Sequence, residues 1–191
     1  GASAHEPCTG LDDTVEELAA LLPGATDVVG FSWGGQVALS LAAQHPAQAR
    51  SVSVISSLVR PLRGAALLDP LVKATLPLAR RRWFAHLQGV SMGVPASMMQ
   101  DYIESSLTVD PSALTGVLAA NNRYVLPETW SDYRGRVMVA YGSAEPRSVR
   151  TSSTALHLSA PQSQLVEVLG AHHDIPFRIP EWLADRIHSP A

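Results

Sequence analysis

The sequence G-F-S-W-G-G at residues 30–35 constrains the fold more than any other stretch of this chain. It follows a short apolar run that ends at Val29, and it precedes residues 36–43, which are compatible with a helix. A serine in the pattern G-x-S-x-G between a strand and a helix is typical of a nucleophile elbow. We expect Gly30 and Gly34 to be needed because a Cβ at either position would crowd the turn. An ordinary glycine-rich loop is the alternative.

Alternating strand and helix patterns surround this motif. Strands are expected at residues 28–29, 51–55, 136–141 and 164–169. Helices are expected at residues 11–22, 36–43, 150–158 and from Pro180 through Ile187. Asp12 or Asp13 is expected to cap the first helix. Strands that alternate with helices predict an α/β fold in which helices cover both faces of a mostly parallel sheet.

Residues 58–132 contain no convincing strand. Helix-like patterns occupy residues 67–87, 96–107 and 112–121, and prolines and glycines, Gly89 among them, interrupt this section. Asp110 is expected to cap the last of these helices. Because a structureless loop of this length is improbable, we predict a helical insertion. The chain would then consist of a core at residues 1–57 and 133–191 and a helical cap at residues 58–132.

Two side chains complete a serine-based site. An activated serine needs a base that accepts its proton and an acid that orients the base. Glu145 follows the strand at 136–141 and His173 follows the strand at 164–169, so both lie at the carboxyl ends of strands, where open α/β sheets place their chemistry. The chain order is serine, acid, histidine. His172 is the alternative base.

These motifs resemble the α/β-hydrolase superfamily, in particular its small serine esterases and haloperoxidase-like members. The resemblance is carried by G-F-S-W-G-G with its trailing helix, by Val137–Pro146 and by Leu169–Asp174, and it covers the chain from Leu11 to the end. In position and helical character, residues 58–132 match the variable cap of that family.

The resemblance implies that Ser32 is the nucleophile, Glu145 the acid and His173 the base. It also implies that the backbone N–H of Trp33 is one donor of the oxyanion hole. The expected activity is cleavage of an ester or related acyl bond through an acyl-enzyme, with no cofactor. No metal site is expected, because the remaining histidines lack metal-ligand spacing.

Three departures from the family pattern limit this expectation. The family more often has aspartate at the position of Glu145, and it usually has glycine at the position of His172. Its first strands, and the loop that supplies the second oxyanion donor, have no counterpart in this sequence. We therefore expect an N-terminally incomplete hydrolase in which the strand at Val28–Val29 is an open edge. A second copy or a separate chain would cover that edge, and without one the chain would be poorly active. A non-catalytic binding or structural relative is the rival.

The expected substrate is a small, apolar acyl compound. Phe31, Met98 and Met99 are candidates to line its pocket, although plain packing within the cap also explains the methionines. Trp33 would form the floor of the pocket or pack behind the elbow.

Composition excludes several other classes of protein. The 191 residues are 46% hydrophobic and carry a formal charge of −3, which is typical of a globular domain and does not indicate nucleic-acid binding. No stretch reaches the apolar length of a membrane span. The single cysteine, Cys8, is compatible with a reducing compartment, and a cytoplasmic location is expected.

Overall fold

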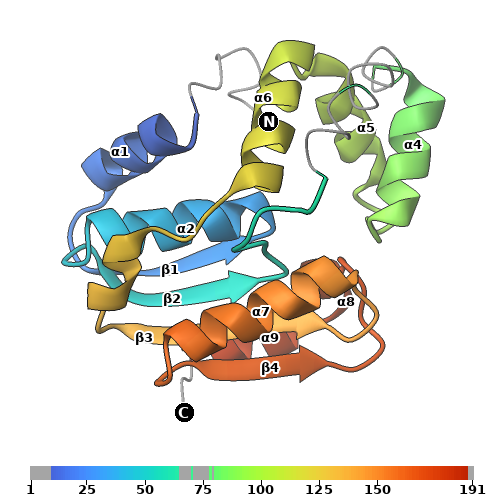
Figure 1. Ribbon diagram of the computed structural model, residues 1–191. Helices are drawn as coiled ribbons and strands as arrows, with labels where there is room; N and C mark the ends of the chain where they lie inside the picture. Colours follow the sequence, from blue (N-terminus) through green and yellow to red (C-terminus); the bar gives the residue numbers. More distant parts are fainter. Residues whose placement is uncertain (1–9, 65–69, 71–77, 79, 189–191) are drawn as a thin grey trace.

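A computed structural model describes residues 10–64, 70, 78 and 80–188. In this part of the chain, four strands form one sheet in the order β1-β2-β3-β4 (Figure 1). The strands are β1 (Thr26–Phe31), β2 (Ala49–Ile55), β3 (Arg136–Gly142) and β4 (Gln164–Val168). Every neighbouring pair is parallel. The expected α/β fold with about four parallel strands is confirmed.

The helices occur close to the predicted positions. They are α1 (Leu11–Leu21), α2 (Trp33–Gln44), α4 (Arg82–Ser91), α5 (Met99–Thr108), α6 (Pro111–Arg123), the 3-10 helix η1 (Glu128–Asp132), α7 (Arg147–Ser159), α8 (Ile175–Arg178) and α9 (Pro180–His188). The short helices η1 and α8 were not predicted. The helix predicted at residues 67–87 falls largely outside the described residues, and α4 is its described counterpart.

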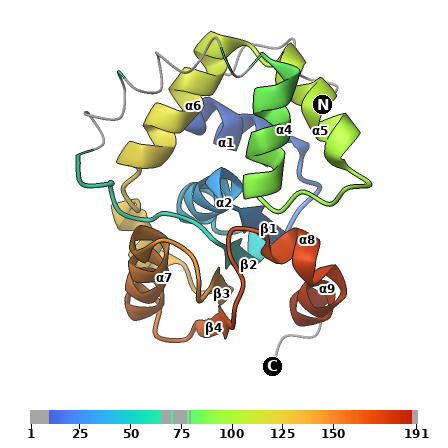
Figure 2. The same ribbon diagram turned by 90° about the vertical axis from the view of Figure 1, so that its right-hand side faces the viewer.

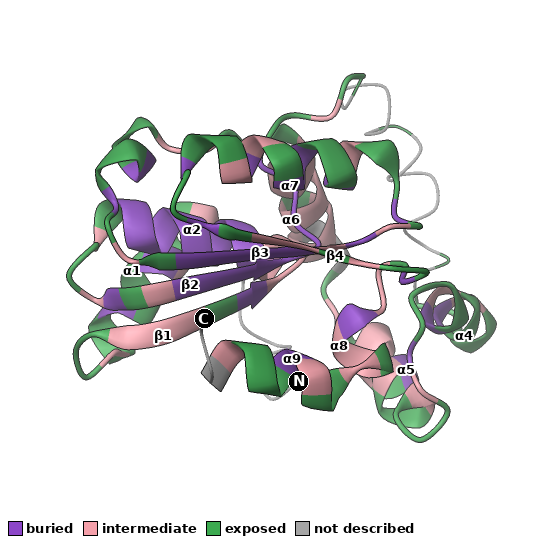
Figure 3. Cartoon of the chain, turned by 90° about the horizontal axis from the view of Figure 1, so that it is seen from below, coloured by how far each residue is buried: buried purple, intermediate pink, exposed green. Residues whose placement is uncertain are grey.

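Different helices cover the two faces of the sheet (Figures 1 and 3). Along β2, Val54 packs into the core formed with α2 and α7, whereas its neighbour Ile55 packs into the core formed with α8 and α9. Successive side chains of a strand point to opposite faces, so β2 contributes to both cores. Helix α1 packs on the outer side of α2 through Val15, which is fully buried.

Helix α1 begins differently from the prediction. Gly10 occupies the capping position with a φ of 122°, and the helix has no side-chain cap. A positive φ of this size favours glycine, so the backbone itself makes the turn into the helix. Asp12 and Asp13 lie in the first turn, where their charges are favourable near the helix N-terminus. The expectation that one of them caps the helix was wrong.

Helices α4, α5 and α6 connect β2 to β3. They lie above and beyond the ends of the strands (Figures 1 and 2). Gly89 lies inside α4 and does not interrupt it, contrary to the prediction. A Cβ on Gly89 would be 2.6 Å from Sδ of Met99, so this glycine lets α5 pack closely against α4. Asp110 caps α6 as predicted, because its Oδ2 lies 3.3 Å from the backbone N of Ala113.

One buried amide joins both ends of this connection to α2. Gln36 is 0% exposed, and its Nε2 donates to the carbonyl oxygen of Leu58 at 3.1 Å and to that of Asn121 at 3.0 Å. Leu58 lies just after β2, and Asn121 lies in the last turn of α6. A further backbone hydrogen bond joins the Leu62 N–H to the Asn122 carbonyl at 2.8 Å. The start and the end of the insertion are therefore held side by side on the helix that follows the elbow.

Strand β1 lies at one edge of the described sheet. Its residue Val29 is 47% exposed, which leaves an apolar side chain at this edge. Among the described residues, no helix combines the length and the apolar character needed to cross a bilayer.

Candidate active site

Ser32 lies in a strained turn between β1 and α2. Its φ of 56° and ψ of −121° are rare for a residue with a side chain. The Ser32 N–H donates to the Ile55 carbonyl at 2.9 Å, which joins the turn to the end of β2. The sharp turn that the motif predicted is therefore present.

The glycines of the motif have different functions from those predicted. A Cβ on Gly30 would be 2.2 Å from the Gly34 carbonyl oxygen, so Gly30 is required as expected. A Cβ on Gly34 would meet no atom within 4 Å, so the expectation of crowding at that position was wrong. The second crowded position is Gly35, where a Cβ would be 2.7 Å from Cβ of Ser57. The constraint arises because the start of α2 packs on the segment that follows β2, which a local motif does not reveal.

His173 connects the serine to the predicted acid. Its Nε2 lies 3.0 Å from Ser32 Oγ, and its Nδ1 lies 2.7 Å from Glu145 Oε1. The Phe31 ring lies beside the imidazole, with 4.8 Å between the ring centroids. His172 is exposed, and its backbone N–H donates to Asp174 Oδ1 at 2.9 Å. Geometry therefore places His173, and not its neighbour, between serine and carboxylate.

Neutral donors hold the Glu145 carboxylate. The side chain is 0% exposed, and its Oε2 accepts hydrogen bonds from the Gly142 N–H at 2.7 Å and from the Ser56 hydroxyl at 3.0 Å. Because the carboxylate folds back onto the backbone three residues earlier, the extra methylene of glutamate is accommodated. A buried carboxylate needs such partners. The two donors leave Oε1 facing His173.

Sequence reasoning did not find Ser56. It follows β2 directly and has a positive φ of 55°, and its N–H donates to the Ala140 carbonyl at 2.9 Å. The strand order brings it beside Glu145, because β2 and β3 are neighbours and end together. The available sequence signal for Ser56 was its position directly after a strand, at the edge of the sheet where the catalytic residues lie. Many residues share such a position, so the signal is weak.

The acid turn and the histidine loop are bonded directly to each other. The Ala144 N–H donates to the Ala171 carbonyl at 3.0 Å, and the Ser143 N–H donates to the Val168 carbonyl at 3.0 Å. A Cβ on Gly142 would be 2.2 Å from the same Ala171 oxygen. These contacts fix the separation of Glu145 and His173 through the backbone.

The insertion also reaches the histidine loop. Gly93, in the turn after α4, has a φ of 72°, and a Cβ on it would be 2.4 Å from Cβ of Asp174. Asp174 directly follows His173, precedes α8 and lies 3.8 Å from Arg178. The loop that carries the imidazole is therefore in close contact with the connection between β2 and β3.

Trp33 is the first residue of α2, so its backbone N–H has no acceptor within the helix. The indole packs against the cluster between α1 and α2 that includes Val15 and Leu41. This contact supports the interpretation that Trp33 packs behind the elbow. Its Nε1 is buried and has no hydrogen-bond partner in the part of the chain that the structure describes.

The candidate pocket residues lie in different places. Phe31 contacts His173, as described above. Met99 packs against Gly89 between α4 and α5, and Met98 is 49% exposed. Packing within the insertion accounts for Met99, so a pocket role for the methionines stays a prediction.

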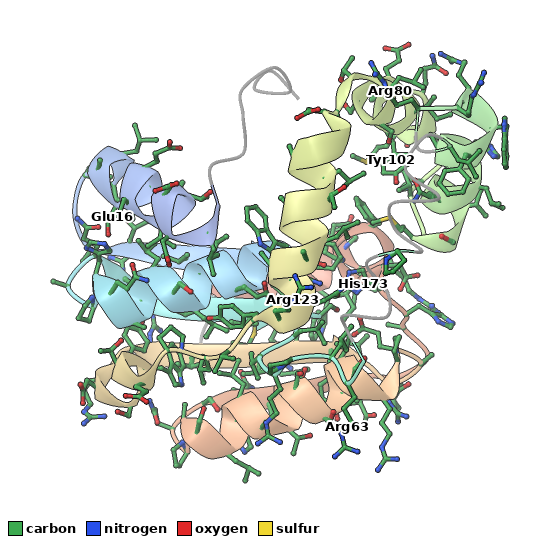
Figure 4. The ribbon with its side chains drawn as sticks, turned by 45° about the horizontal axis from the view of Figure 1, so that its top comes forward. Glu16, Arg63, Arg80, Tyr102, Arg123 and His173 are labelled. Carbon is green, nitrogen blue, oxygen red and sulfur yellow. The ribbon has the colours of Figure 1, made fainter. Side chains whose placement is uncertain are left out.

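Figure 4 shows His173 in the middle of the molecule, below Tyr102 on α5 and Arg80 in the turn before α4, and away from Glu16 on α1. Within the described residues, no group of three or more histidine, cysteine, aspartate or glutamate side chains is arranged to hold a metal ion.

A parallel sheet with a strained serine at a strand–helix turn, hydrogen-bonded through histidine to a buried carboxylate, defines the α/β-hydrolase class. The model of the alpha/beta hydrolase family matches residues 1–186, and the chain belongs to this family. No curated protein sequence matches the chain.

Solved structures share the fold at low sequence identity. A protein named as a non-heme bromoperoxidase, BpoC, from Mycobacterium tuberculosis has a TM-score of 0.72 at 17% identity, over 96% of this chain and 74% of its own. A thermophilic esterase from Thermogutta terrifontis has a TM-score of 0.72 at 19% identity, over 94% and 71%. An E-2-(acetamidomethylene)succinate hydrolase has a TM-score of 0.74 at 21% identity, over 95% and 74%.

Proposed function

We propose that this protein is a serine hydrolase that cleaves an ester or a related acyl bond through an acyl-enzyme. The observation that carries the proposal is the hydrogen-bond chain from Ser32 Oγ through His173 to Glu145, with distances of 3.0 and 2.7 Å. A serine, a base and an orienting acid in this geometry can generate a nucleophile at neutral pH.

The reaction would proceed in two halves. His173 Nε2 takes the Ser32 proton as Oγ attacks the acyl carbon, and the resulting imidazolium donates that proton to the leaving group. Glu145 accepts the Nδ1–H throughout, which keeps the imidazole in the productive tautomer. In the second half His173 activates a water molecule that hydrolyses the acyl-enzyme. Nucleophile, base and water supply this chemistry, so it needs no cofactor.

The oxyanion of the tetrahedral intermediate would be stabilised at the start of α2. The backbone N–H of Trp33 and the positive end of the helix dipole lie beside the serine. Loss of one oxyanion-hole donor typically lowers turnover about 10²–10³-fold. With Trp33 as its one assigned donor, the described part of the chain would turn over slowly.

Residues 58–132 would form a helical cap that selects a small apolar acyl substrate. The contact of Gly93 with Asp174 and the position of α4–α6 beyond the strand ends support this role. At the edge of β1, the exposed Val29 supports association with a second copy or a separate chain.

A fluorophosphonate probe tests the proposal directly, because it reacts rapidly only with an activated serine. We expect labelling of the unmodified protein and none of the Ser32→Ala variant. His173→Ala should lose labelling, and the matched control His172→Ala should keep it. A folded chain that is not labelled would support the rival class, a non-catalytic relative with a binding role.

A further inference from the structure

A cavity of about 530 Å³ lies between the segment after β2 and the first two turns of α7. It is lined by Arg60, Pro61, Leu62, Arg63, Arg147, Ser148, Thr151 and Ser152. This lining, here called the arginine cavity, contains none of the three residues of the proposed triad. Figure 4 shows Arg63 beside α7, away from His173.

The charge of the arginine cavity is of one sign. Among the residues that the structure describes, three guanidinium groups line it and no carboxylate does. Within the described part of the chain, Arg60, Arg63 and Arg147 form no ion pair. The whole chain has a formal charge of −3, so this positive cluster is local and does not follow from the composition. Like charges gathered around a cavity attract an anion.

The N-terminus of α7 adds donors to the same wall. This helix has 13 residues, is preceded by Pro146, and has no side-chain cap. The N–H groups of Val149 and Arg150 donate to the Pro146 carbonyl. Those of Arg147 and Ser148, in the first turn, have no helical acceptor, and such groups bind anions.

Ser152 adds a free hydroxyl to the lining of the cavity. The residue lines the cavity and is 2% exposed, and its hydroxyl has no hydrogen-bond partner among the residues that the structure describes. The neighbouring hydroxyls differ: Thr151 donates to the Arg147 carbonyl at 2.8 Å and Ser153 to the Val149 carbonyl at 3.1 Å. Ser152 Oγ is not among the buried atoms that lack a partner, so this free hydroxyl reaches the solvent in the cavity, where a ligand can bond to it.

Both walls of the cavity are fixed in place. On one side, Leu62 is bonded to the end of α6, and Leu58 is bonded to Gln36. On the other side, α7 is anchored by Val149 and Leu156, which are 8% and 0% exposed. The backbone of such a site does not have to be ordered when a ligand binds, which favours affinity.

We propose that the arginine cavity binds a small organic molecule through a phosphate or carboxylate group. The planar guanidinium fork matches both of these oxyanions in bidentate hydrogen bonds. The volume falls within the range of small-molecule sites and exceeds that of a single oxyanion, so the cavity has room for an organic group attached to the anion. This inference does not rest on the proposed hydrolase activity.

Calorimetric titration at fixed ionic strength tests the site with three probes that share one ring: phenyl phosphate, benzoate and phenol. We expect saturable 1:1 binding of at least one anion, and we expect phenol not to bind. The stronger anion identifies the oxyanion, and either ranking supports the site. Arg63→Ala and Arg147→Ala should each weaken binding about tenfold, as expected for loss of a charge-assisted hydrogen bond.

Arg150→Ala is the matched control, because Arg150 is exposed on the same helix and does not line the cavity. It should bind the anion unchanged, and Ser32→Ala should do so as well. Three outcomes would overturn the proposal: no saturable binding of either anion, equal weakening in Arg150→Ala, or binding of phenol as tight as that of the anions. Binding that disappears in Ser32→Ala would place the anion at the serine and would also overturn it.

Discussion

Two carboxylates at opposite ends of the sheet are held in opposite ways. Asp27, at the start of β1, is 34% exposed and contacts cations: Arg50 Nε lies 3.0 Å and Arg136 3.9 Å from its Oδ1. Glu145, after the end of β3, is 0% exposed and contacts a backbone N–H, a hydroxyl and an imidazole.

The two carboxylates, Asp27 and Glu145, have different functions at the two ends of the sheet. Hydrogen bonds from Arg50 and Ser51 hold the pKa of Asp27 well below its ordinary value of 3.8, so this group stays ionised in solvent. Exposed ion pairs of this kind contribute little to stability. The donors on Glu145 instead determine which carboxylate oxygen faces His173. The buried hydrogen bonds orient the Glu145 carboxylate toward His173, and neutral donors are sufficient for this.

Glu145→Gln breaks the buried arrangement and should have the largest effect. The Gly142 N–H requires an acceptor, so the amide oxygen takes the place of Oε2 and the amide NH₂ faces His173 Nδ1. The imidazole must then carry its proton on Nε2 and cannot accept the Ser32 proton. We expect kcat/KM for p-nitrophenyl acetate to fall about 10³–10⁴-fold without unfolding.

Circular dichroism and the unfolding midpoint serve as controls for this variant. Glu145→Asp, which keeps the charge but shortens the side chain, should lose less activity than Glu145→Gln. Retention of more than a tenth of the activity by a folded Glu145→Gln protein would contradict the assignment of the acid.

Ser56→Ala removes one of the two donors to Glu145 Oε2. The Gly142 N–H remains, so the carboxylate loses part of its orientation and not its charge. We expect kcat/KM to fall about tenfold, mainly through kcat, because a hydrogen bond to a charged group is lost. Steady-state kinetics measure this split.

Ser56→Gly is the matched control, because glycine adopts the positive φ of this position without strain. Equal losses in the alanine and glycine variants would assign the effect to the hydroxyl. Full activity in the glycine variant would mean that backbone conformation, and not the hydrogen bond, is responsible.

Asp27→Asn should have the smallest effect, and only on stability. Because the folded pKa is lowered, the contribution of Asp27 is fully present above its unfolded pKa of 3.8 and is lost as the pH falls toward the folded value. At pH 7 we expect the variant to be less stable by about 0–1 kcal/mol in urea unfolding. This difference should shrink below pH 3.8, while activity at pH 7 stays unchanged. A difference that grows in acid would contradict this account.

The strands and the elbow were predictable because each depends on residues that are close in sequence. The hydrophobic run before the motif indicated β1, and turn residues marked the ends of β3 and β4. His173 could not be distinguished from His172 by pattern, because one residue of displacement in a loop decides which ring points inward.

Other features could not be predicted, because they depend on contacts between distant segments. Ser56 bonds to a residue 89 positions away. The crowding at Gly35 arises from Ser57, and that at Gly93 arises from Asp174. A local motif describes the backbone of a turn, whereas these constraints appear only when the strands are assembled in order.

The amide of Gln36 has a consequence for how this chain can vary. It fixes the distance between Leu58 and Asn121, so the residues between them form a loop whose ends are already closed. The entropy of closing a flexible loop changes slowly with length, by about 0.6 kcal/mol for each doubling. Segments of quite different length can therefore be exchanged between these two points with little effect on the free energy of the sheet, and the elbow serine keeps its geometry while the surface above it changes.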